Sequence, residues 1–273
     1  DSRRKSRLFA ETAARIFAGR GIRVMIVREL MPTPYLSFLT REGQCGMGVM
    51  ITASHNPAAY NGYKVYNSDG CQITDAVAAE VARFIGEESY FGEENAPFDE
   101  YVRQGTICFA AEETEEKYLQ GIRNIVGETD LSGLKIAYSA LNGTGYRLVP
   151  KLLESAGANV LLTEPQCVPD ENFATCPYPN PEKREALALG IKTAEENGCD
   201  LLLATDPDAD RVGIAVRCGD ACIPFTGNEV GLLLLQYLLE ERRGRGEDTS
   251  RLLVIKTIVT TDLAEKIAAE YGA

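Results

Sequence analysis

Three aspartates, Asp206, Asp208 and Asp210, stand at alternate positions in the segment TDPDADR. In an extended or looped backbone this spacing directs alternate side chains toward one place. Three carboxylates about 5 Å apart repel one another by roughly 3 kcal/mol per pair at an effective dielectric of about 20, so we expect a cation between them. Oxygen ligands select a hard ion, either calcium or magnesium. An exposed acidic turn is the alternative, and the buried strand predicted at 200–204 disfavours it.

Calcium is the less favoured of the two ions. An EF-hand loop also begins D-x-D-x-D, but it requires glycine at its sixth position and glutamate at its twelfth. Arg211 and Arg217 stand at those positions, and a predicted strand rather than a helix precedes the loop. The pattern therefore favours magnesium.

A candidate nucleophile, Ser54, lies in the run TASHNP. It follows an apolar stretch that Pro57 prevents from continuing as strand or helix, so the serine is presented at the tip of a rigid element. The next pair, Asn61-Gly62, predicts a tight turn, and a strand at 63–66 then returns Lys64 toward the same loop. The alternative is a simple turn whose Ser and Asn side chains bond their own backbone.

Two other classes of enzyme fit these motifs poorly. A serine hydrolase needs a separate histidine oriented by a carboxylate, but the only histidine, His55, adjoins Ser54, and neighbours in an extended segment point to opposite sides. The G-x-S-x-G elbow is also missing. A HAD-like phosphatase would carry its D-x-D directly after the first strand of its fold, whereas these aspartates follow a late strand.

The composition limits the partners of such a site. The chain has 273 residues, and its 40 acidic and 28 basic side chains give a net charge of −12. This surface repels nucleic acid and anionic lipid, so a phosphate-bearing ligand must be held by a few cations, a metal or backbone amides. Apolar runs fall short of the roughly 20 residues that cross a bilayer, and the eight cysteines form no C-x-x-C pair. We expect a folded cytoplasmic protein with reduced thiols, without a membrane segment or a nucleic-acid partner.

The elements that must position these motifs alternate between strand-length apolar runs and amphipathic helices, which predicts α/β layers with parallel or mixed sheets. A polar break at 127–130 predicts a domain boundary, and a third unit opens near residue 220. The expected domains are 1–130, 131–220 and 221–273, the last being incomplete. We expect helices at 6–17, 74–85, 112–126, 146–156, 182–197, 228–241 and 261–271, and strands at 22–27, 48–52, 63–66, 135–138, 159–162, 200–204 and 252–255.

Taken together, the runs TASHNP, NGYK and DPDADR resemble the signature set of the α-D-phosphohexomutase superfamily, in the family's order. Weaker similarities are Asp1-Ser2-Arg3, Pro32-Thr33-Pro34, the run PNPE at 179–182 and the run GNE at 227–229. The run at 55–64 is most similar to the branch with phosphoglucomutase 2-like and phosphopentomutase-like enzymes. The resemblance implies consecutive three-layer α/β/α domains with mixed sheets, equivalent to the family's domains 1 to 3.

The resemblance also implies roles for single residues. Ser54 carries the phosphoryl group, and Mg2+ bridges it to the three aspartates. A phosphoserine would donate its phosphate to a sugar monophosphate, and the bisphosphate intermediate would reorient and return phosphate from its other end. A sugar 1,6-bisphosphate would act as phosphoryl donor. The remaining candidates are Lys64 as acid/base or phosphate contact, His55 as a catalytic residue beside Ser54 without an assigned role, and Arg211 and Arg3 as phosphate-binding groups.

The implied activity is that of a phosphosugar mutase, which transfers phosphate between the 1-position and the terminal hydroxymethyl carbon. Glucose phosphates are favoured over pentose and mannose phosphates. A noncatalytic metal-binding scaffold is the alternative, and the intact Ser54, Lys64 and aspartates argue against it. The family's Gly-rich opening segment, sugar-recognition loop and phosphate-binding domain fall outside this sequence. We therefore expect this chain alone to bind magnesium with little turnover and to self-associate, and its oligomeric state stays open.

Overall fold

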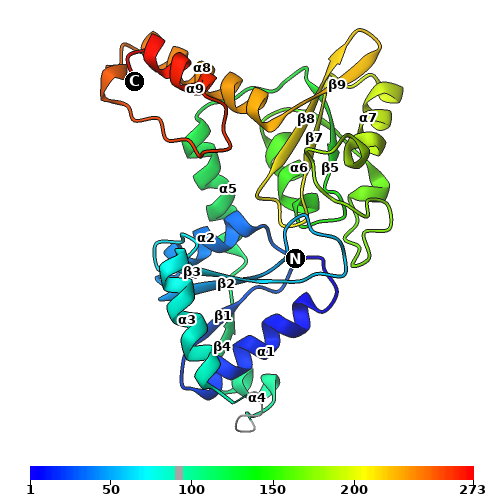
Figure 1. Ribbon diagram of the computed structural model, residues 1–273. Coiled ribbons are helices and arrows are strands. Elements are labelled where there is room, and N and C mark those ends of the chain that lie inside the picture. Colours follow the sequence, from blue (N-terminus) through cyan, green and yellow to red (C-terminus); the bar gives the residue numbers. More distant parts are fainter. Residues whose placement is uncertain (90–94) are drawn as a thin grey trace.

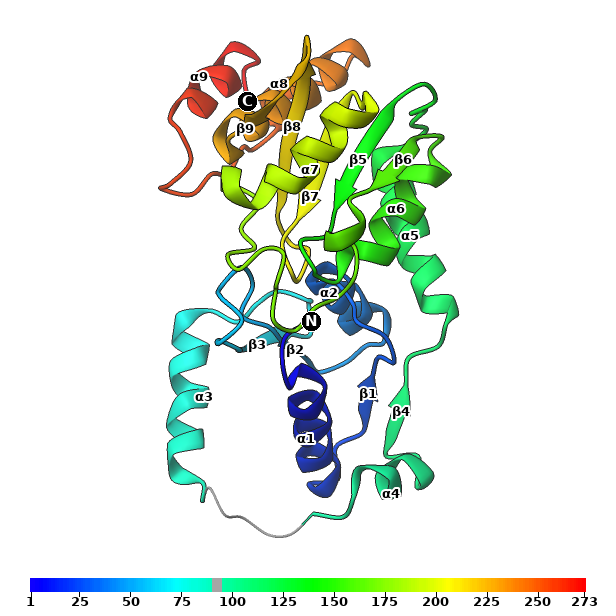
Figure 2. The ribbon, with the colours of Figure 1, turned by 90° about the vertical axis from the view of Figure 1, so that its right-hand side faces the viewer.

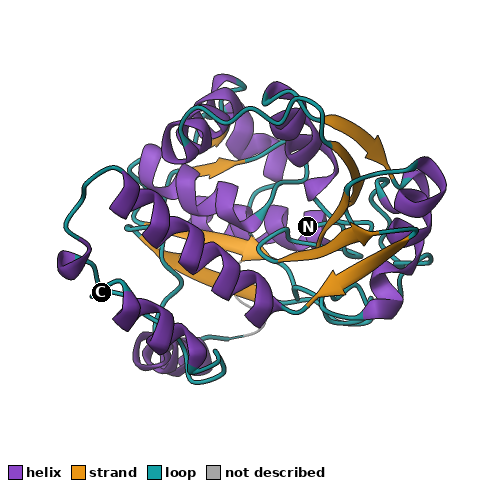
Figure 3. Cartoon of the chain, turned by 90° about the horizontal axis from the view of Figure 1, so that it is seen from above, coloured by secondary structure: helices purple, strands orange, loops and turns teal. Residues whose placement is uncertain are grey.

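The computed structural model describes residues 1–89 and 95–273, and Figure 1 shows two α/β units, one above the other, with two further helices beside the upper unit. Helices lie on both sides of the central strands when the molecule is seen from above (Figure 3). The sheets contain both parallel and antiparallel pairs. The predicted α/β class with mixed sheets is therefore confirmed.

The first unit carries two small sheets. Its elements are α1 (Ser6–Gly19), β1 (Val24–Ile26), α2 (Thr33–Glu42), β2 (Met47–Ile51), β3 (Tyr63–Asn67), α3 (Asp75–Glu87), α4 (Phe98–Arg103), β4 (Ile107–Phe109) and α5 (Glu113–Val126). β1 pairs with β4 in parallel, whereas β2 and β3 form an antiparallel pair. A groove of about 780 Å³ lies between β1 and β2, and α1 contacts both strands. The register of the second pair sets Lys64 opposite Met50, close to the serine loop.

The second unit is built on one mixed sheet. Its elements are β5 (Lys135–Ser139), α6 (Gly145–Ser155), β6 (Asn159–Leu162), α7 (Arg184–Asn197), β7 (Leu201–Thr205), β8 (Val212–Cys218) and β9 (Ala221–Phe225). The strand order is β6-β5-β7-β8-β9, with parallel pairing up to β7 and antiparallel pairing beyond it. Leu202 and Ala204 of β7 are completely buried, and α7 covers one face of the sheet (Figure 2). This buried strand gives the aspartate loop a rigid base.

Helix α5, the last element of the first unit, packs against both units. Leu119 of α5 is buried against Tyr35 of α2 and Leu148 of α6. The Tyr35 ring also meets the Tyr118 ring edge-on, with centroids 5.4 Å apart. Apolar burial of this size is worth about 2 kcal/mol per large side chain, so α5 fixes the start of α2 relative to the second unit.

The C-terminal part contains α8 (Gly227–Gly244) and α9 (Leu263–Glu270), which pack on each other. A capping box formed by Thr226 and Glu229 begins α8. The strand predicted at 252–255 is wrong for the described structure: this segment is extended but pairs with no strand there, and Leu253 and Ile255 are each 83% exposed. An apolar run without a neighbouring edge to pair with cannot form a sheet.

The sheet of the second unit continues past the expected boundary at residue 220, because β9 pairs with β8 along residues 221–225. The division into three domains stays a prediction. Among the described helices, none is both long and apolar enough to span a bilayer.

Candidate active site

Two loops from different units meet at one point. The loop after β2 carries Ser54, and the loop after β7 carries Asp206. The Ser54 hydroxyl donates a hydrogen bond to Asp206 Oδ2 over 3.0 Å, although the two residues lie 152 positions apart in the chain. The sequence placed both motifs at strand ends, and the structure brings them into direct contact.

The three aspartates form a compact cluster. Their carboxylate oxygens lie within 4.8 Å of one another, with Asp206 and Asp208 buried and Asp210 exposed. The turn closes on itself because the backbone N–H groups of Asp210 and Arg211 donate to Asp206 Oδ1, at 3.2 and 3.1 Å. The expected convergence of the alternate side chains is therefore present in the structure.

Asp208 is completely buried in this cluster. Its Oδ2 accepts hydrogen bonds from the Thr33 hydroxyl at 2.9 Å and from the Lys64 ammonium at 2.8 Å. Its Oδ1 is buried and has no hydrogen-bond partner among the described residues. A buried carboxylate oxygen without a partner is costly, and this one belongs to a set of hard oxygen donors. The cluster therefore fits a metal ion, held by Asp206, Asp208 and Asp210.

The electrostatics of the cluster agree with this fit. Burial, followed by the charges of Asp208 and Asp210, raises the pKa of Asp206 to about 7. Burial also acts to raise the pKa of Asp208, but the Lys64 ammonium and the Thr33 hydroxyl outweigh it and hold that pKa below its ordinary value. Without a cation, the crowded carboxylates thus retain a proton on Asp206 near neutral pH.

Three basic side chains surround the cluster. Burial opposes the charged form of Lys64, but its contacts with Asp208 and Asp210, at 2.8 and 3.3 Å, raise its pKa, so the ammonium persists. Burial and the charge of Arg211 lower the pKa of His55, which keeps its imidazole neutral at pH 7. His55 Nδ1 lies 3.4 Å from Ser54 Oγ. The expectation that these neighbours point to opposite sides is therefore wrong, because the backbone at Ser54 is left-handed rather than extended. The Arg211 side chain is 43% exposed, and its one ion pair among the described residues is with Asp210 at 4.0 Å, so its donors can meet an anion.

The serine loop has an unusual backbone. Ser54 adopts a left-handed conformation with φ of 54°, which costs a non-glycine residue about 1 kcal/mol. The Ser54 N–H donates to Thr52 Oγ1 at 2.9 Å, and the Thr52 hydroxyl donates to Asp1 Oδ2 at 2.7 Å. This chain of hydrogen bonds ties Asp1 to the serine.

The predicted site residues fall into two groups. Ser54 and Lys64 both bond to the aspartate cluster, Ser54 through Asp206 and Lys64 through Asp208 and Asp210. His55 and Arg211 lie at the edge of this cluster. Arg3 lies elsewhere, buried behind the serine loop, where its guanidinium faces backbone carbonyls. Its phosphate-binding role stays a prediction without a contact to support it.

Sequence reasoning did not assign Thr33 or Thr52 to the site. Thr33 follows a proline that begins α2, and its N–H donates to the Asp208 carbonyl at 2.8 Å. In the sequence, the run Pro32-Thr33-Pro34 predicted the start of a helix, but it did not predict that Thr33 contacts Asp208.

The raised pKa of Asp206 predicts that metal binding depends on pH. Because the pKa of Asp206 is raised to about 7 in the metal-free protein, a cation that binds the three carboxylates would have to displace a proton below that pH. We expect the apparent Mg2+ affinity to fall by up to about tenfold per pH unit below pH 7 and to change little above pH 8. Calorimetric titration in buffers of different ionisation enthalpy would measure both affinity and proton release. An affinity constant from pH 6 to pH 8, with no proton released, would contradict the prediction.

Known proteins define the class to which this fold and site belong. The family models described as phosphoglucomutase/phosphomannomutase alpha/beta/alpha domain I and domain II match residues 1–91 and 116–219. The chain belongs to the phosphoglucomutase/phosphomannomutase family, the α-D-phosphohexomutases, which confirms the resemblance seen in the sequence.

Individual relatives agree with this classification. The chain is 36% identical to a phosphoglucomutase of Staphylococcus saprophyticus over 275 residues, which cover 100% of this chain and 49% of the relative. It therefore spans about half the length of the curated relatives it matches. A putative phosphomannomutase from Thermus thermophilus has the same fold, with a TM-score of 0.71 at 24% identity over 89% of this chain and 52% of the other. An N-acetylphosphoglucosamine mutase from Aspergillus fumigatus, solved with glucose 1,6-bisphosphate, matches with a TM-score of 0.50 at 15% identity, over 78% of this chain and 52% of the other.

Proposed function

We propose that the complete protein is a phosphosugar mutase in which Ser54 carries the phosphoryl group. The single observation that carries this proposal is the 3.0 Å hydrogen bond from the Ser54 hydroxyl to Asp206 within a cluster of three carboxylates. A nucleophile and a candidate metal site from two different units share one point, which is what phosphoryl transfer requires, since that reaction depends on positioning and charge stabilisation.

The proposed metal is Mg2+, held by Asp206, Asp208 and Asp210 together with an oxygen on Ser54. When bound, it supplies positive charge that stabilises the phosphoryl group during transfer. Arg211, exposed beside Asp210, adds a second positive group within reach of phosphate oxygens. Calcium is less favoured because the loop lacks the further ligands of a calcium site.

Residues of this chain can accept and supply the protons that move when a phosphoryl group is transferred to Ser54. As Ser54 Oγ forms its bond to phosphorus, the bond from phosphorus to the sugar oxygen breaks. The serine proton passes to His55 Nδ1, which is neutral and 3.4 Å away. The Lys64 ammonium, whose raised pKa keeps it charged, offers a proton to the departing sugar oxygen. Once the sugar has reoriented, Lys64 takes the proton of its other hydroxyl group as that oxygen forms a bond to phosphorus. The bond from phosphorus to Ser54 Oγ breaks, and His55 returns its proton to the serine.

The proposed substrates are the 1- and 6-phosphates of glucose, with glucose 1,6-bisphosphate as intermediate and phosphoryl donor. The curated relative at 36% identity is a phosphoglucomutase, and the Aspergillus neighbour was solved with glucose 1,6-bisphosphate. Pentose and mannose phosphates are the alternative substrates. The resemblance of residues 55–64 to phosphopentomutase-like enzymes makes the pentose phosphates worth equal testing.

A substrate panel with peptide mapping tests this function. We expect the complete protein to interconvert glucose 1-phosphate and glucose 6-phosphate in the presence of Mg2+, faster than the phosphates of ribose or mannose. After incubation with glucose 1,6-bisphosphate, the peptide containing Ser54 should gain the mass of one phosphoryl group. If another sugar phosphate were converted faster, that sugar would replace glucose as the proposed substrate. If the protein bound Mg2+ but took up no phosphate, the noncatalytic scaffold would be favoured.

A further inference from the structure

Arg3 is the most completely engaged side chain near the serine loop, and it is only 3% exposed. A guanidinium has five N–H donors. Arg3 Nε donates to Asp1 Oδ2 at 3.1 Å, NH1 donates to the carbonyls of Pro57 and Tyr60 at 3.0 Å each, and NH2 donates to the carbonyls of Asn56 at 2.6 Å and of Ser54. All five donors are used within the protein.

This pattern explains why the serine loop can keep its shape. Four carbonyl groups from one short segment, at 54, 56, 57 and 60, point inward to a single cation. Without that cation the four acceptors would converge on one another with no donor between them, which is unfavourable for partly buried groups. The left-handed backbone of Ser54 begins the same segment and needs such support to persist.

The guanidinium is also connected to the unit that carries the aspartates. Arg3 lies over the ring of Phe173, with its central carbon 4.9 Å from the ring centroid. Phe173 is completely buried in the loop that precedes α7. The flat guanidinium therefore has the serine loop at its edge and the second unit against its face.

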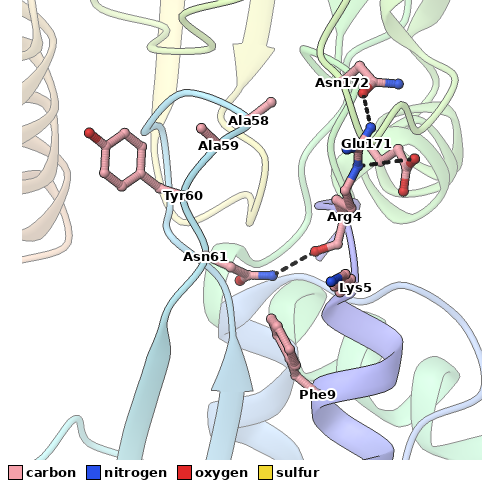
Figure 4. A pocket seen from close by; sticks show the side chains of 9 residues that line it. All are labelled: Arg4, Lys5, Phe9, Ala58, Ala59, Tyr60, Asn61, Glu171 and Asn172. Atoms are coloured by element: carbon pink, nitrogen blue, oxygen red, sulfur yellow. Dashed lines mark hydrogen bonds and ion pairs between the residues drawn. The ribbon is translucent and has the colours of Figure 1, made fainter.

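Neighbouring contacts place the same two units against each other at the surface. Figure 4 shows Arg4 between the serine loop and the second unit, at the rim of a pocket of about 400 Å³. The Arg4 guanidinium reaches Asn172 at 2.8 Å and Glu171 at 3.5 Å, while Asn61 donates to the Arg4 carbonyl at 3.1 Å. These side chains are largely exposed, so their ion pair contributes little energy. The buried contact of Arg3 is the stronger link.

We propose that Arg3 is a positioning residue, which holds the Ser54 loop in the conformation that aims Oγ at Asp206 and aligns it with the aspartate-bearing unit through Phe173. This inference rests on the proposed function and replaces the phosphate-binding role expected from the sequence. A side chain with all its donors committed has none left for a substrate phosphate.

The test compares Arg3→Lys with an exposed control, Arg20→Lys, in the complete protein. Lysine keeps the charge but has three donors on one nitrogen, so it cannot reach four carbonyls and a carboxylate in a fixed fork. Arg20 adjoins the end of α1, and its side chain is 67% exposed. Single-turnover transfer from glucose 1,6-bisphosphate to Ser54 should slow by about thirtyfold in Arg3→Lys, with little change in Mg2+ affinity or in KM, and should be unchanged in Arg20→Lys.

Hydrogen exchange of the peptide covering residues 53–61 gives a readout that does not depend on activity. Its amides include the N–H groups of Ser54, Asn56 and Tyr60, which bond within the loop. We expect this exchange to accelerate at least about tenfold in Arg3→Lys, and not in Arg20→Lys. A milder variant, Phe173→Leu, keeps the apolar contact and should slow transfer less, which covers the case in which Arg3→Lys does not fold.

The outcomes separate the two proposals. If the parent takes no phosphate from glucose 1,6-bisphosphate, the proposed function fails, and the exchange rates still decide whether Arg3 holds the loop. If Arg3→Lys raises KM with an unchanged turnover number, Arg3 binds phosphate and the positioning role is overturned. Transfer and loop exchange both within threefold of the parent would overturn it as well.

Discussion

Replacing Ser54 by alanine is expected to lower mutase turnover by more than about a thousandfold, because no other hydroxyl group among the described residues donates a hydrogen bond to Asp206. Phosphate incorporation from glucose 1,6-bisphosphate should disappear with it. The three carboxylates remain in Ser54→Ala, so Mg2+ affinity should fall by no more than about tenfold. A coupled assay, intact-mass measurement and calorimetry on the complete protein would give these three values.

An exposed serine in the first unit provides the matched control. Ser68 lies in the turn after β3, outside the acidic cluster. Ser68→Ala should retain parental turnover and phosphate incorporation. If Ser54→Ala kept activity within tenfold of the parent, or still gained a phosphoryl group, Ser54 would not be the nucleophile.

The contrast between Ser54 and Arg3 shows how far a sequence alone could lead. The serine and aspartate motifs are local, since each lies directly after a predicted buried strand and each consists of residues suited to one kind of chemistry. The two motifs come into contact because the ends of β2 and β7 face each other. Both motifs could therefore be predicted, from residue type and spacing, as parts of one candidate site.

The supporting residues could not be found in this way. Thr33 reaches Asp208 across 175 positions, and Arg3 reaches Tyr60 across 57. Neither contact leaves a periodic or local trace in the chain, because it depends on how separate elements pack. For the same reason the apolar run at 252–255 looked like a strand, since sequence does not show whether a neighbouring edge is available.

Gly143 connects the fold to the site by close packing, and its replacement by alanine should be severely destabilising. A Cβ at this position would lie 2.3 Å from Pro207 Cα, 2.6 Å from its carbonyl oxygen and 2.8 Å from its carbonyl carbon. All three are backbone atoms, so no side-chain rotation can relieve the clash. The neighbouring Thr144 N–H also donates to the Pro207 carbonyl at 2.8 Å. We expect a loss of at least about 3 kcal/mol in the free energy of unfolding.

The same clash should weaken metal binding, because Pro207 lies between Asp206 and Asp208 and cannot move without them. We expect Mg2+ affinity in Gly143→Ala to fall by at least about tenfold. Gly231→Ala is the control, since a Cβ there meets nothing within 4 Å and the position lies inside α8. Alanine should stabilise that helix by up to about 1 kcal/mol. Chemical denaturation would measure the free energy of unfolding of both variants, and calorimetry would measure their Mg2+ affinity. If Gly143→Ala were as stable as the parent, the aspartate loop would not depend on the close approach of Gly143, in the turn before α6, to Pro207.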